Sequence, residues 1–400
     1  MSNIYDELME RKLIDNTVYG EELREKLGKE KVVCYIGFDP TARSLHIGSL
    51  VAILFLVRMQ RAGHTPIALV GGATGSIGDP SFRNDMRPMM SEETRQENVE
   101  RIKAQIASFF DPNVENKLIV VNNEDWIKKM SWLDMLKVIG ANMSVNRMLS
   151  HDCFKSRMEK GLSFLEFNYM PMQAYDFWHL YKEYGCTLEL GGSDQWANII
   201  EGVELIRKKE NKPAYAMTLP LLTKADGTKM GKTAGGAIWL DREMCSDYDF
   251  YQFFRDVEDV KVRELFLSLT FLSIQEIDEI CNVEGKAINA AKERLAYEIT
   301  KIVRGEESAK TAQAQARAAF GAGSQENMPS VEIASKDAET IIDVLLALKE
   351  AKSRGDAKRL IDGGAIKVDD EVISAFDTKI EKKEFVLRKG KKTIIKVVVK

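Results

Sequence analysis

Apolar segments alternate with helical segments in the first third of the chain, and this alternation limits the folds available to it. Three predominantly apolar segments have the composition of strands buried on both faces of a parallel sheet: residues 31–38, 65–72 and 117–123. Residues 46–63 and 91–110 lie between them and have helical patterns, the second with Ser91 as its N-cap. Strands that alternate with helices predict a doubly wound, Rossmann-like parallel sheet in an α/β protein.

The remaining sequence predicts further parts around this sheet. Helices are expected over 164–184 and 193–210 on either side of a strand at 186–192, and the pattern from 246 to 320 is helical almost throughout. Residues 321–330 have the composition of a linker. Residues 331–400 are expected to begin with a helix and to finish in short strands. We therefore expect four parts: a sheet domain (1–222), a loop with a helical domain (223–320), the linker (321–330) and a small α+β domain (331–400).

Composition excludes several classes of protein. The chain has 400 residues, which is too many for a single hydrophobic core of ordinary size, so two or three domains are expected. No apolar run reaches the roughly 18 residues that a bilayer span needs, and the N-terminus lacks an apolar signal core, so a cytoplasmic protein without membrane contact is expected. Five scattered cysteines, none in a Cys-x-x-Cys pair, argue against disulfides and against zinc.

Charge is unevenly distributed along the chain. Residues 330–400 carry a net charge of +3, whereas the rest of the chain carries −7. A basic C-terminal part on an acidic body indicates a polyanionic partner for that part.

The segment "GFDPTARSLHIGSL" leaves the first strand and enters the first helix. Ligands of doubly wound sheets bind beyond the carboxyl ends of strands. His46 can donate a hydrogen bond to a phosphate oxygen there, and Gly48 leaves room for a flat group such as a purine. The alternative is an ordinary helix start with a packing glycine.

The segment "TKADGTKMGKT", residues 223–233, is a second candidate for a phosphate site. Asp226-Gly227 is a tight-turn signal. Lys229, Lys232 and Thr233 on a glycine-containing loop can close over a triphosphate and offset its charge. The alternative is a solvated basic loop.

Together the two segments resemble the signatures of the class I aminoacyl-tRNA synthetases, usually His-x-Gly-His and Lys-Met-Ser-Lys-Ser. The resemblance implies that Thr41, His46, Ser49, Lys229, Lys232 and Thr233 stabilise the α-phosphate of ATP as it is attacked. It also implies that ATP, accompanied by Mg²⁺, is a substrate and that no cofactor is permanently bound. The implied ATP contacts are Gly37, Asp39, His46, Gly48, Gly192, Asp194 and Lys232.

Four further segments resemble the tyrosyl-tRNA synthetase family: "CYIGFDPTARSLHIGSL", "GGATGSIGDPS", "YMPMQAYDF" and "GGSDQWANII". The resemblance covers nearly the whole chain and implies L-tyrosine as a substrate. Tyr35 and Asp176 would flank its phenolic hydroxyl, which needs both a donor and an acceptor. A site built to hydrogen-bond a hydroxyl rejects the analogue that lacks it, and this family is the standard case of that discrimination. The other implied contacts are Asp79, Tyr169 and Gln173 for the ammonium and Gln195 for the carboxyl and ribose side.

Some positions depart from the family pattern, and the roles of others have two interpretations. Ser49 stands where a second His is usual, and Ala197 replaces a usual Gly. Glu189 stands where many relatives carry Gln, and it either adds charge near the substrate ammonium or faces solvent. Arg83 and Arg87 match basic positions on a loop implied to reach pyrophosphate, with ordinary surface arginines as the alternative.

The segment 353–373 resembles a small RNA-binding module that many members of the family carry at the C-terminus. It implies tRNA for tyrosine as a partner, with Arg354, Lys358 and Arg359 as phosphate contacts. The alternative is a basic face that is only solvated. The resemblance also implies a homodimer paired through roughly residues 120–160, within the sheet domain, although a buried core explains the apolar residues of this segment equally well.

Three other functions are compatible with parts of the sequence. The segment "GGATGSIG" imitates the glycine loop of nicotinamide-dependent oxidoreductases, but Asp79-Pro80-Ser81 follows it instead of a helix. A non-catalytic RNA-binding protein is suggested by Ser49. The sister enzyme for tryptophan shares both signatures, but Tyr35 with Asp176 and the basic C-terminal part argue against it.

Overall fold

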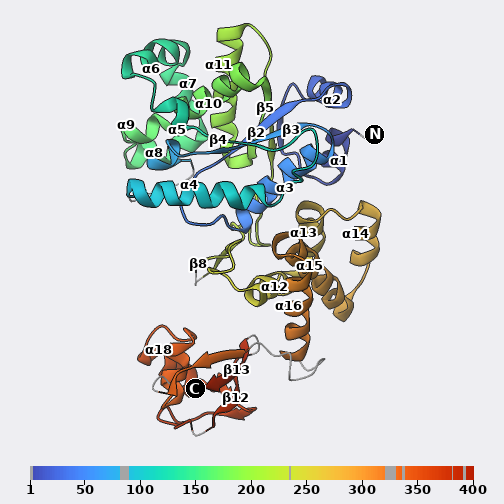
Figure 1. The fold of residues 1–400 in the computed structure, drawn as a ribbon, viewed down its shortest axis with the longest axis vertical. Helices are drawn as coiled ribbons and strands as arrows, with labels where there is room; N and C mark the ends of the chain where they lie inside the picture. Colours follow the sequence, from blue (N-terminus) through green and yellow to red (C-terminus); the bar gives the residue numbers. More distant parts are fainter. Residues whose placement is uncertain are drawn as a thin grey trace. The chain divides into compact units, whose positions relative to one another are not determined.

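The structure is a computed structural model, and Figure 1 shows its ribbon. It describes residues 3–81, 90–233, 236–319, 330–335, 338–380, 382–390 and 393–400. The chain divides into two compact units. The first comprises Met1–Cys245 with Val257–Leu295, and the second comprises Ser246–Asp256 with Ala296–Lys400.

The first unit is built on a six-stranded sheet in the order β1-β6-β5-β2-β3-β4. Its strands are β1 (Asn16–Val18), β2 (Val33–Phe38), β3 (Thr65–Val70), β4 (Ile119–Asn122), β5 (Cys186–Gly192) and β6 (Tyr215–Leu219). All neighbours from β6 to β4 run parallel, which confirms the predicted doubly wound parallel sheet. β1 adds an antiparallel edge that the sequence pattern did not indicate. Strand order reverses between β2 and β5, so this pair forms the switch point where such sheets bind ligands.

Helices cover both faces of this sheet. In Figure 1, α3 and α4 lie on one side and α10 and α11 on the other. The helices and short 3-10 turns of the sheet domain are α1 (Ile4–Glu10), α2 (Gly20–Lys29), α3 (Ile47–Arg61), η1 (Thr74–Ser76), α4 (Glu92–Ala107), α5 (Glu124–Ile127), α6 (Trp132–Val138), η2 (Gly140–Asn142), α7 (Val145–Ser150), α8 (Asp152–Lys160), α9 (Phe164–Phe167), α10 (Tyr169–Tyr184), η3 (Ser193–Gln195) and α11 (Trp196–Glu210). Ser91 caps α4 by accepting from the Thr94 N–H, as predicted. The helical pattern expected over 164–184 is confirmed, with a break at Asn168 that divides the segment into α9 and α10.

A helical region follows the sheet domain within the first unit. It contains β7 (Lys232–Thr233), β8 (Gly236–Ala237), η4 (Asp259–Lys261), α13 (Val262–Leu269), α14 (Ile274–Cys281) and η5 (Gly285–Ala287). The buried Arg58 of α3 donates to the carbonyls of Leu267 and Thr270. Burial lowers the pKa of Arg58 to about 9. These bonds fasten α13 to the helix that carries the first signature.

The second unit contains helices and a small α+β domain. Its elements are α12 (Asp247–Arg255), most of α15 (Ile288–Arg304), α16 (Glu306–Ala319), β9 (Ser330–Ile333), α17 (Ile341–Ala347), α18 (Arg354–Asp362), β10 (Ile366–Val368), β11 (Glu371–Val372), β12 (Glu384–Lys389) and β13 (Thr393–Val399). The five strands follow the order β11-β10-β12-β13-β9, with β13 and β9 parallel and the other pairs antiparallel. The side chains of α17, α18 and this sheet form a separate apolar core.

No helix in the described part of the chain is long and apolar enough to cross a membrane.

Candidate active site

A cavity of about 500 Å³ opens where β2 and β5 end, at the switch point of the sheet. Segments far apart in the sequence line it, which brings most of the predicted site residues together. The predicted residues that line it are Tyr35, Gly37, Asp39, Thr41, His46, Gly48, Ser49, Asp79, Tyr169, Gln173, Asp176, Gly192, Asp194, Gln195 and Lys229. A strand end, a helix start and a distant loop therefore share one site.

Asp176 is buried, at 2% exposure, and both of its carboxylate oxygens are held. The indole N–H of Trp126 donates to Oδ1 at 2.7 Å, and the amide of Asn123 donates to Oδ2 at 2.9 Å. Burial raises the pKa of Asp176 to about 7, although these two hydrogen bonds act to lower it. The two donors orient the carboxylate as an acceptor that faces the cavity beside Tyr35.

Glu189 does not face solvent, so one of the two alternatives left by the sequence, a solvent-exposed side chain, is excluded. It is 1% exposed on β5, and its Oε1 accepts from the Gln173 side-chain amide at 3.0 Å. Because the amide of Gln173 donates to Glu189, its own oxygen remains available to the cavity as an acceptor. The other departure on this side, Ala197, packs its methyl group against an apolar cluster that includes Met148 and Phe154.

Other polar residues of the cavity are joined to one another by hydrogen bonds. Asp79 accepts from the Gln195 amide at 2.6 Å. The hydroxyl of Tyr169 donates to Asp39 Oδ2 at 3.0 Å, and that of Thr74 donates to Oδ1 at 2.8 Å. Burial raises the pKa of Tyr169 well above its usual value, and the nearby carboxylates add to this effect. The site therefore presents oriented carboxylates and hydroxyls, a set that suits an ammonium group.

His46 caps α3 with its ring. Its Nδ1 accepts the Gly48 N–H at 3.0 Å, so in the neutral ring the proton lies on Nε2, which is then a donor. A Cβ on residue 48 would lie 2.7 Å from His46 Cε1. Gly48 is thus required by the histidine ring itself, in addition to any ligand that lies against the helix.

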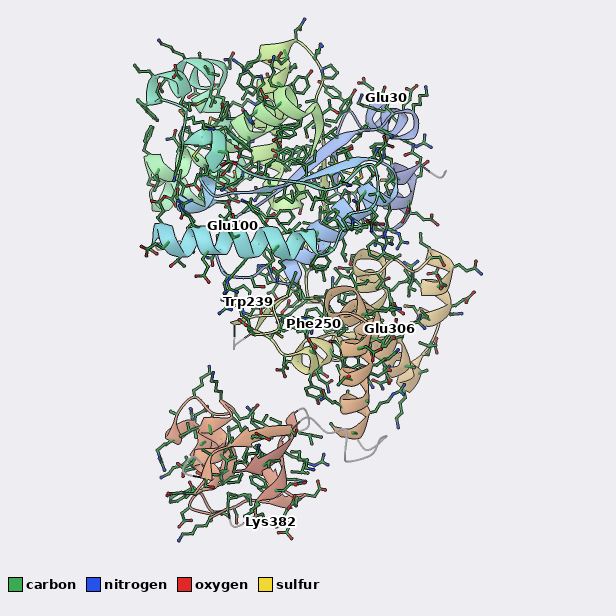
Figure 2. The ribbon with its side chains drawn as sticks, viewed as in Figure 1. Glu30, Glu100, Trp239, Phe250, Glu306 and Lys382 are labelled. Carbon is green, nitrogen blue, oxygen red and sulfur yellow. The ribbon has the colours of Figure 1, made fainter. Side chains whose placement is uncertain are left out.

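The second signature packs directly on the first. Gly231 has a φ of +89°, and a Cβ there would lie 2.5 Å from Ile47 Cγ1. The following segment continues this contact, because the Ile47 N–H donates to the Ile238 carbonyl at 3.0 Å and Trp239 pairs with His46 across an isolated bridge. Trp239 is labelled in Figure 2.

Lys229 lies in the same cavity and pairs with Asp194 at 2.7 Å. The pair joins the loop to the 3-10 turn η3 that follows β5. A cation from the second signature is therefore held at the mouth of the site that contains His46.

Other predicted residues lie elsewhere. Lys232 and Thr233 form β7, of which the backbone alone is described, and Arg83 and Arg87 lie outside the described residues. The three predicted residues of the C-terminal domain, Arg354, Lys358 and Arg359, lie on α18. Arg354 pairs with Asp343 and Arg359 with Asp356, each at 3.3 Å, and Lys358 Nζ lies 4.0 Å from the ring centroid of Phe376.

The sequence reasoning missed several residues of the site. Asn123 and Trp126 were not predicted to support Asp176, and Thr74 was not predicted to hold Asp39. A signal for Asn123 was present, because it is a polar residue at the carboxyl end of a buried strand, where doubly wound folds place their ligands. Trp126 follows it on α5, but nothing in its local sequence indicates a partner 50 residues away.

The glycine-rich segment after β3 does not open a long helix. Residues Thr74–Ser76 form a single 3-10 turn, and the chain then continues without a helix to Ser81. The N-terminal helix turn that binds a dinucleotide pyrophosphate is missing from this part of the described chain. Among the residues that the structure describes, no group of three or more His, Cys, Asp or Glu is placed to hold a metal ion.

Comparison with known proteins agrees with this geometry. Residues 26–321 match the family of tRNA synthetases class I (W and Y), and residues 321–397 match the tyrosine–tRNA ligase SYY-like C-terminal domain. The tyrosine–tRNA ligase of Clostridium kluyveri is 48% identical over 407 residues, which is 100% of both proteins. That of Fusobacterium nucleatum is 50% identical over 375 residues, 93% of this chain and 92% of that protein.

A solved structure has the same fold. The C-terminally truncated mitochondrial tyrosyl-tRNA synthetase of Aspergillus nidulans superposes with a TM-score of 0.71 at 30% identity, over 79% of this chain and 94% of that one. With two family matches that together span residues 26–397 and full-length relatives of one activity, the chain belongs to the class I aminoacyl-tRNA synthetases, in the branch of the tyrosine–tRNA ligases.

Proposed function

We propose that the cavity activates L-tyrosine with ATP and then charges the tRNA for tyrosine. The tyrosine carboxylate attacks the α-phosphate of ATP, so that a carboxylate–phosphorus bond forms and the bond to the β-phosphate oxygen breaks. Pyrophosphate leaves, and tyrosyl-adenylate remains. A hydroxyl of the 3′-terminal adenosine of the tRNA then takes the tyrosyl group and AMP leaves.

The observation that carries this proposal is the contact between the two signatures. Gly231 packs on Ile47, and Lys229 and His46 line one cavity. A neutral imidazole donor and a lysine cation that line the same cavity suit the developing charge on a phosphate. Neither group needs to act as a nucleophile or a general base, because positioning and charge stabilisation supply the rate.

We assign the two ends of the cavity by their chemistry. Tyr35 and Asp176 lie at the buried end and hold the phenolic hydroxyl of tyrosine, while Asp79, Tyr169 and Gln173 hold the ammonium. ATP lies at the other end, accompanied by Mg²⁺, between the start of α3 and the 223–233 loop. Gly37, Asp39, Gly48, Gly192 and Asp194 contact ATP in this assignment, and Gln195 lies at the carboxyl and ribose side. All six line the cavity. In this assignment Ser49 donates a single hydrogen bond to the nucleotide, and His46 remains the main contact of the first signature.

ATP–pyrophosphate exchange measured with each of the twenty amino acids tests the proposal. Tyrosine alone is expected to support rapid exchange. Exchange with tryptophan and not tyrosine would indicate the sister activity, and no exchange with any amino acid would indicate an RNA-binding protein without catalysis.

We also propose a homodimer that forms through the sheet domain. Large apolar side chains are exposed on α6 to α9, which lie together at one side of that domain (Figure 1). They are Trp132, Leu133, Leu136, Val145, Met158, Phe164 and Leu165. The rings of Trp132 and Phe164 lie 5.9 Å apart edge to face, so α6 and α9 form a continuous surface. Apolar patches of this kind are rare on monomers and are typical of interfaces.

The C-terminal domain is proposed to bind the tRNA. Arg354 and Arg359 are exposed on α18, at 68% and 81% of their side-chain area. Lys358 is oriented by its contact with the Phe376 ring. Such cations fix the position of a phosphate backbone more than they read its sequence. A cytoplasmic location belongs to the same proposal, because tRNA charging takes place where translation does.

A further inference from the structure

Glu189 is a buried acid that supports two residues of the proposed tyrosine site. It lies opposite Tyr35 in the register of strands β5 and β2, and its Oε1 accepts from Gln173. Tyr35 and Gln173 both line the cavity, and Glu189 lies behind them. An acid in this position can influence how both side chains present their hydrogen-bonding atoms to a ligand.

Two polar atoms at this place are buried without a partner. Within the described residues, neither the Tyr35 hydroxyl nor Glu189 Oε2 has a hydrogen-bond partner of ordinary geometry, although the two side chains are neighbours on adjacent strands and are close enough for the Tyr35 hydroxyl to lower the pKa of Glu189. The space around Oε2 is restricted, because a Cβ on Gly202 of α11 would lie 3.1 Å from it. A buried polar group that stays unpaired costs free energy, so a proton shared between these two atoms is favoured.

The surroundings of Glu189 favour its neutral form. Burial raises the pKa of Glu189 to about 8, against the lowering effects of Gln173 and Tyr35, and the carboxylate of Asp176 raises it further. Burial likewise raises the pKa of Tyr35, and Glu189 adds to that effect. The titratable groups that face Glu189 are Tyr35 on β2, Asp176 on α10 and Cys186 at the start of β5. Its neighbour on β6 is Ala216, which does not titrate.

We propose that protonated Glu189 sets the direction of hydrogen bonding at the phenol of the substrate. This rests on the proposed function. The acid donates through Oε2 to the Tyr35 oxygen, which leaves the Tyr35 proton for the phenolic oxygen of the bound tyrosine. The phenolic proton of the substrate then goes to Asp176, whose oxygens accept. Once Glu189 ionises, the Tyr35 proton turns toward Glu189, and the phenolic oxygen of the substrate loses its donor.

Glu189 therefore determines specificity through Tyr35 without touching the substrate. Phenylalanine has no phenolic oxygen and gains nothing from the Tyr35 donor. The preference for tyrosine over phenylalanine should thus decline as Glu189 ionises. Both amino acids carry the same ammonium and carboxylate groups, so the titration of those groups cancels in the ratio.

The test measures kcat/KM for tyrosine in pyrophosphate exchange, and the inhibition constant of phenylalanine against it, across the pH range. For a group that titrates near 8, the wild-type preference is expected to fall about 10- to 25-fold between pH values of about 7.5 and 9.5. Glu189→Gln keeps the shape, accepts from Gln173 and donates permanently to Tyr35. In this variant the preference should stay level over the same range.

A matched control and a second variant secure the result. Glu201 is also buried, at 2% exposure, but its Oε1 pairs with His151 and Arg147 outside the cavity. In Glu201→Gln, the preference for tyrosine over phenylalanine should fall at alkaline pH as it does in the wild type. Tyr35→Phe removes the hydroxyl through which Glu189 acts, and should abolish the decline even if Glu189→Gln does not fold.

The outcomes separate this inference from the proposed function. A wild-type preference that stays level with pH overturns the inference, and so does a decline that persists in Glu189→Gln or Tyr35→Phe. In both cases exchange with tyrosine leaves the proposed function intact. Absence of exchange with tyrosine in the wild type at every pH refutes the proposed function and this inference with it.

Discussion

Replacing Trp126 with Phe should weaken tyrosine binding without any change to a residue that lines the cavity. The substitution deletes the indole N–H that donates to Asp176 Oδ1 at 2.7 Å. It keeps an aromatic ring at the position that stacks on His179 with a centroid distance of 4.3 Å. Asp176 then retains one donor, the amide of Asn123.

The size of the effect follows from the lost hydrogen bond. A hydrogen bond to a charged group contributes about 1.5–3 kcal/mol. Since one pKa unit corresponds to 1.36 kcal/mol, its loss should raise the pKa of Asp176 by about one to two units from its value of about 7. If tyrosine needs the ionised acceptor, the ionised fraction at a pH of about 7.5 falls about 3- to 25-fold, and kcat/KM for tyrosine falls with it.

The assay is tyrosine-dependent pyrophosphate exchange at several pH values. The deficit of Trp126→Phe relative to the wild type should be large near pH 6.5 and shrink toward pH 8.5, because the carboxylate ionises in both proteins as the pH rises. A deficit that is equal at all pH values would refute the reasoning, since it would indicate loss of packing and not a shift in the titration of Asp176.

Trp178→Phe is the matched control for this experiment. Trp178 also donates its indole N–H to a carboxylate at 2.7 Å, but the acceptor is Glu210, outside the cavity. The same atoms are deleted from the same kind of bond, on the helix that carries Asp176. This variant should keep the wild-type kcat/KM and its pH dependence.

Four other changes test the remaining parts of the proposal. Gly231→Ala forces a methyl group against Ile47 at a positive φ, and should reduce exchange at least tenfold while tyrosine binding, followed by equilibrium dialysis, is kept. Lys232→Ala should lose most adenylate formation with tyrosine affinity nearly intact, and equal losses in both would count against its role. Deleting residues 330–400 should spare exchange and abolish tRNA charging, so a truncated chain that still charges tRNA would contradict the assignment of that domain. Leu133→Asp should give monomers in sedimentation experiments, whereas an unchanged mass would exclude this surface as the interface.

Local sequence patterns predicted the sheet, and the resemblance of the motifs to a known family named many of the polar residues that line the cavity. Short-range signals are enough for a buried strand, for the Ser91 cap and for the glycine two residues after His46. The signatures are also local, and each carries its glycines and polar groups within a few residues. Lys229 could therefore be named from its own loop, whereas Tyr35 and Gln195 were named through the family resemblance. All three line one cavity.

Contacts between distant segments could not be predicted in this way. The hydroxyl of Tyr169 is paired with a carboxylate 130 residues earlier, and Trp126 with one 50 residues later. The sequence left open whether Glu189 faces solvent or the substrate. Burial of β5 between its neighbours answered this, because both of its faces are covered.

The sequence alone determined which chemical groups the chain brings to its site, because strand ends, helix starts and glycine turns are encoded within a few residues. The tertiary structure alone decided which of those groups face one another, and in which direction each hydrogen bond runs. That difference has a physical cause. Propensity and turn geometry depend on near neighbours along the chain, whereas the proton state of a buried acid such as Glu189 depends on water exclusion and on partners that only the packed sheet brings into contact.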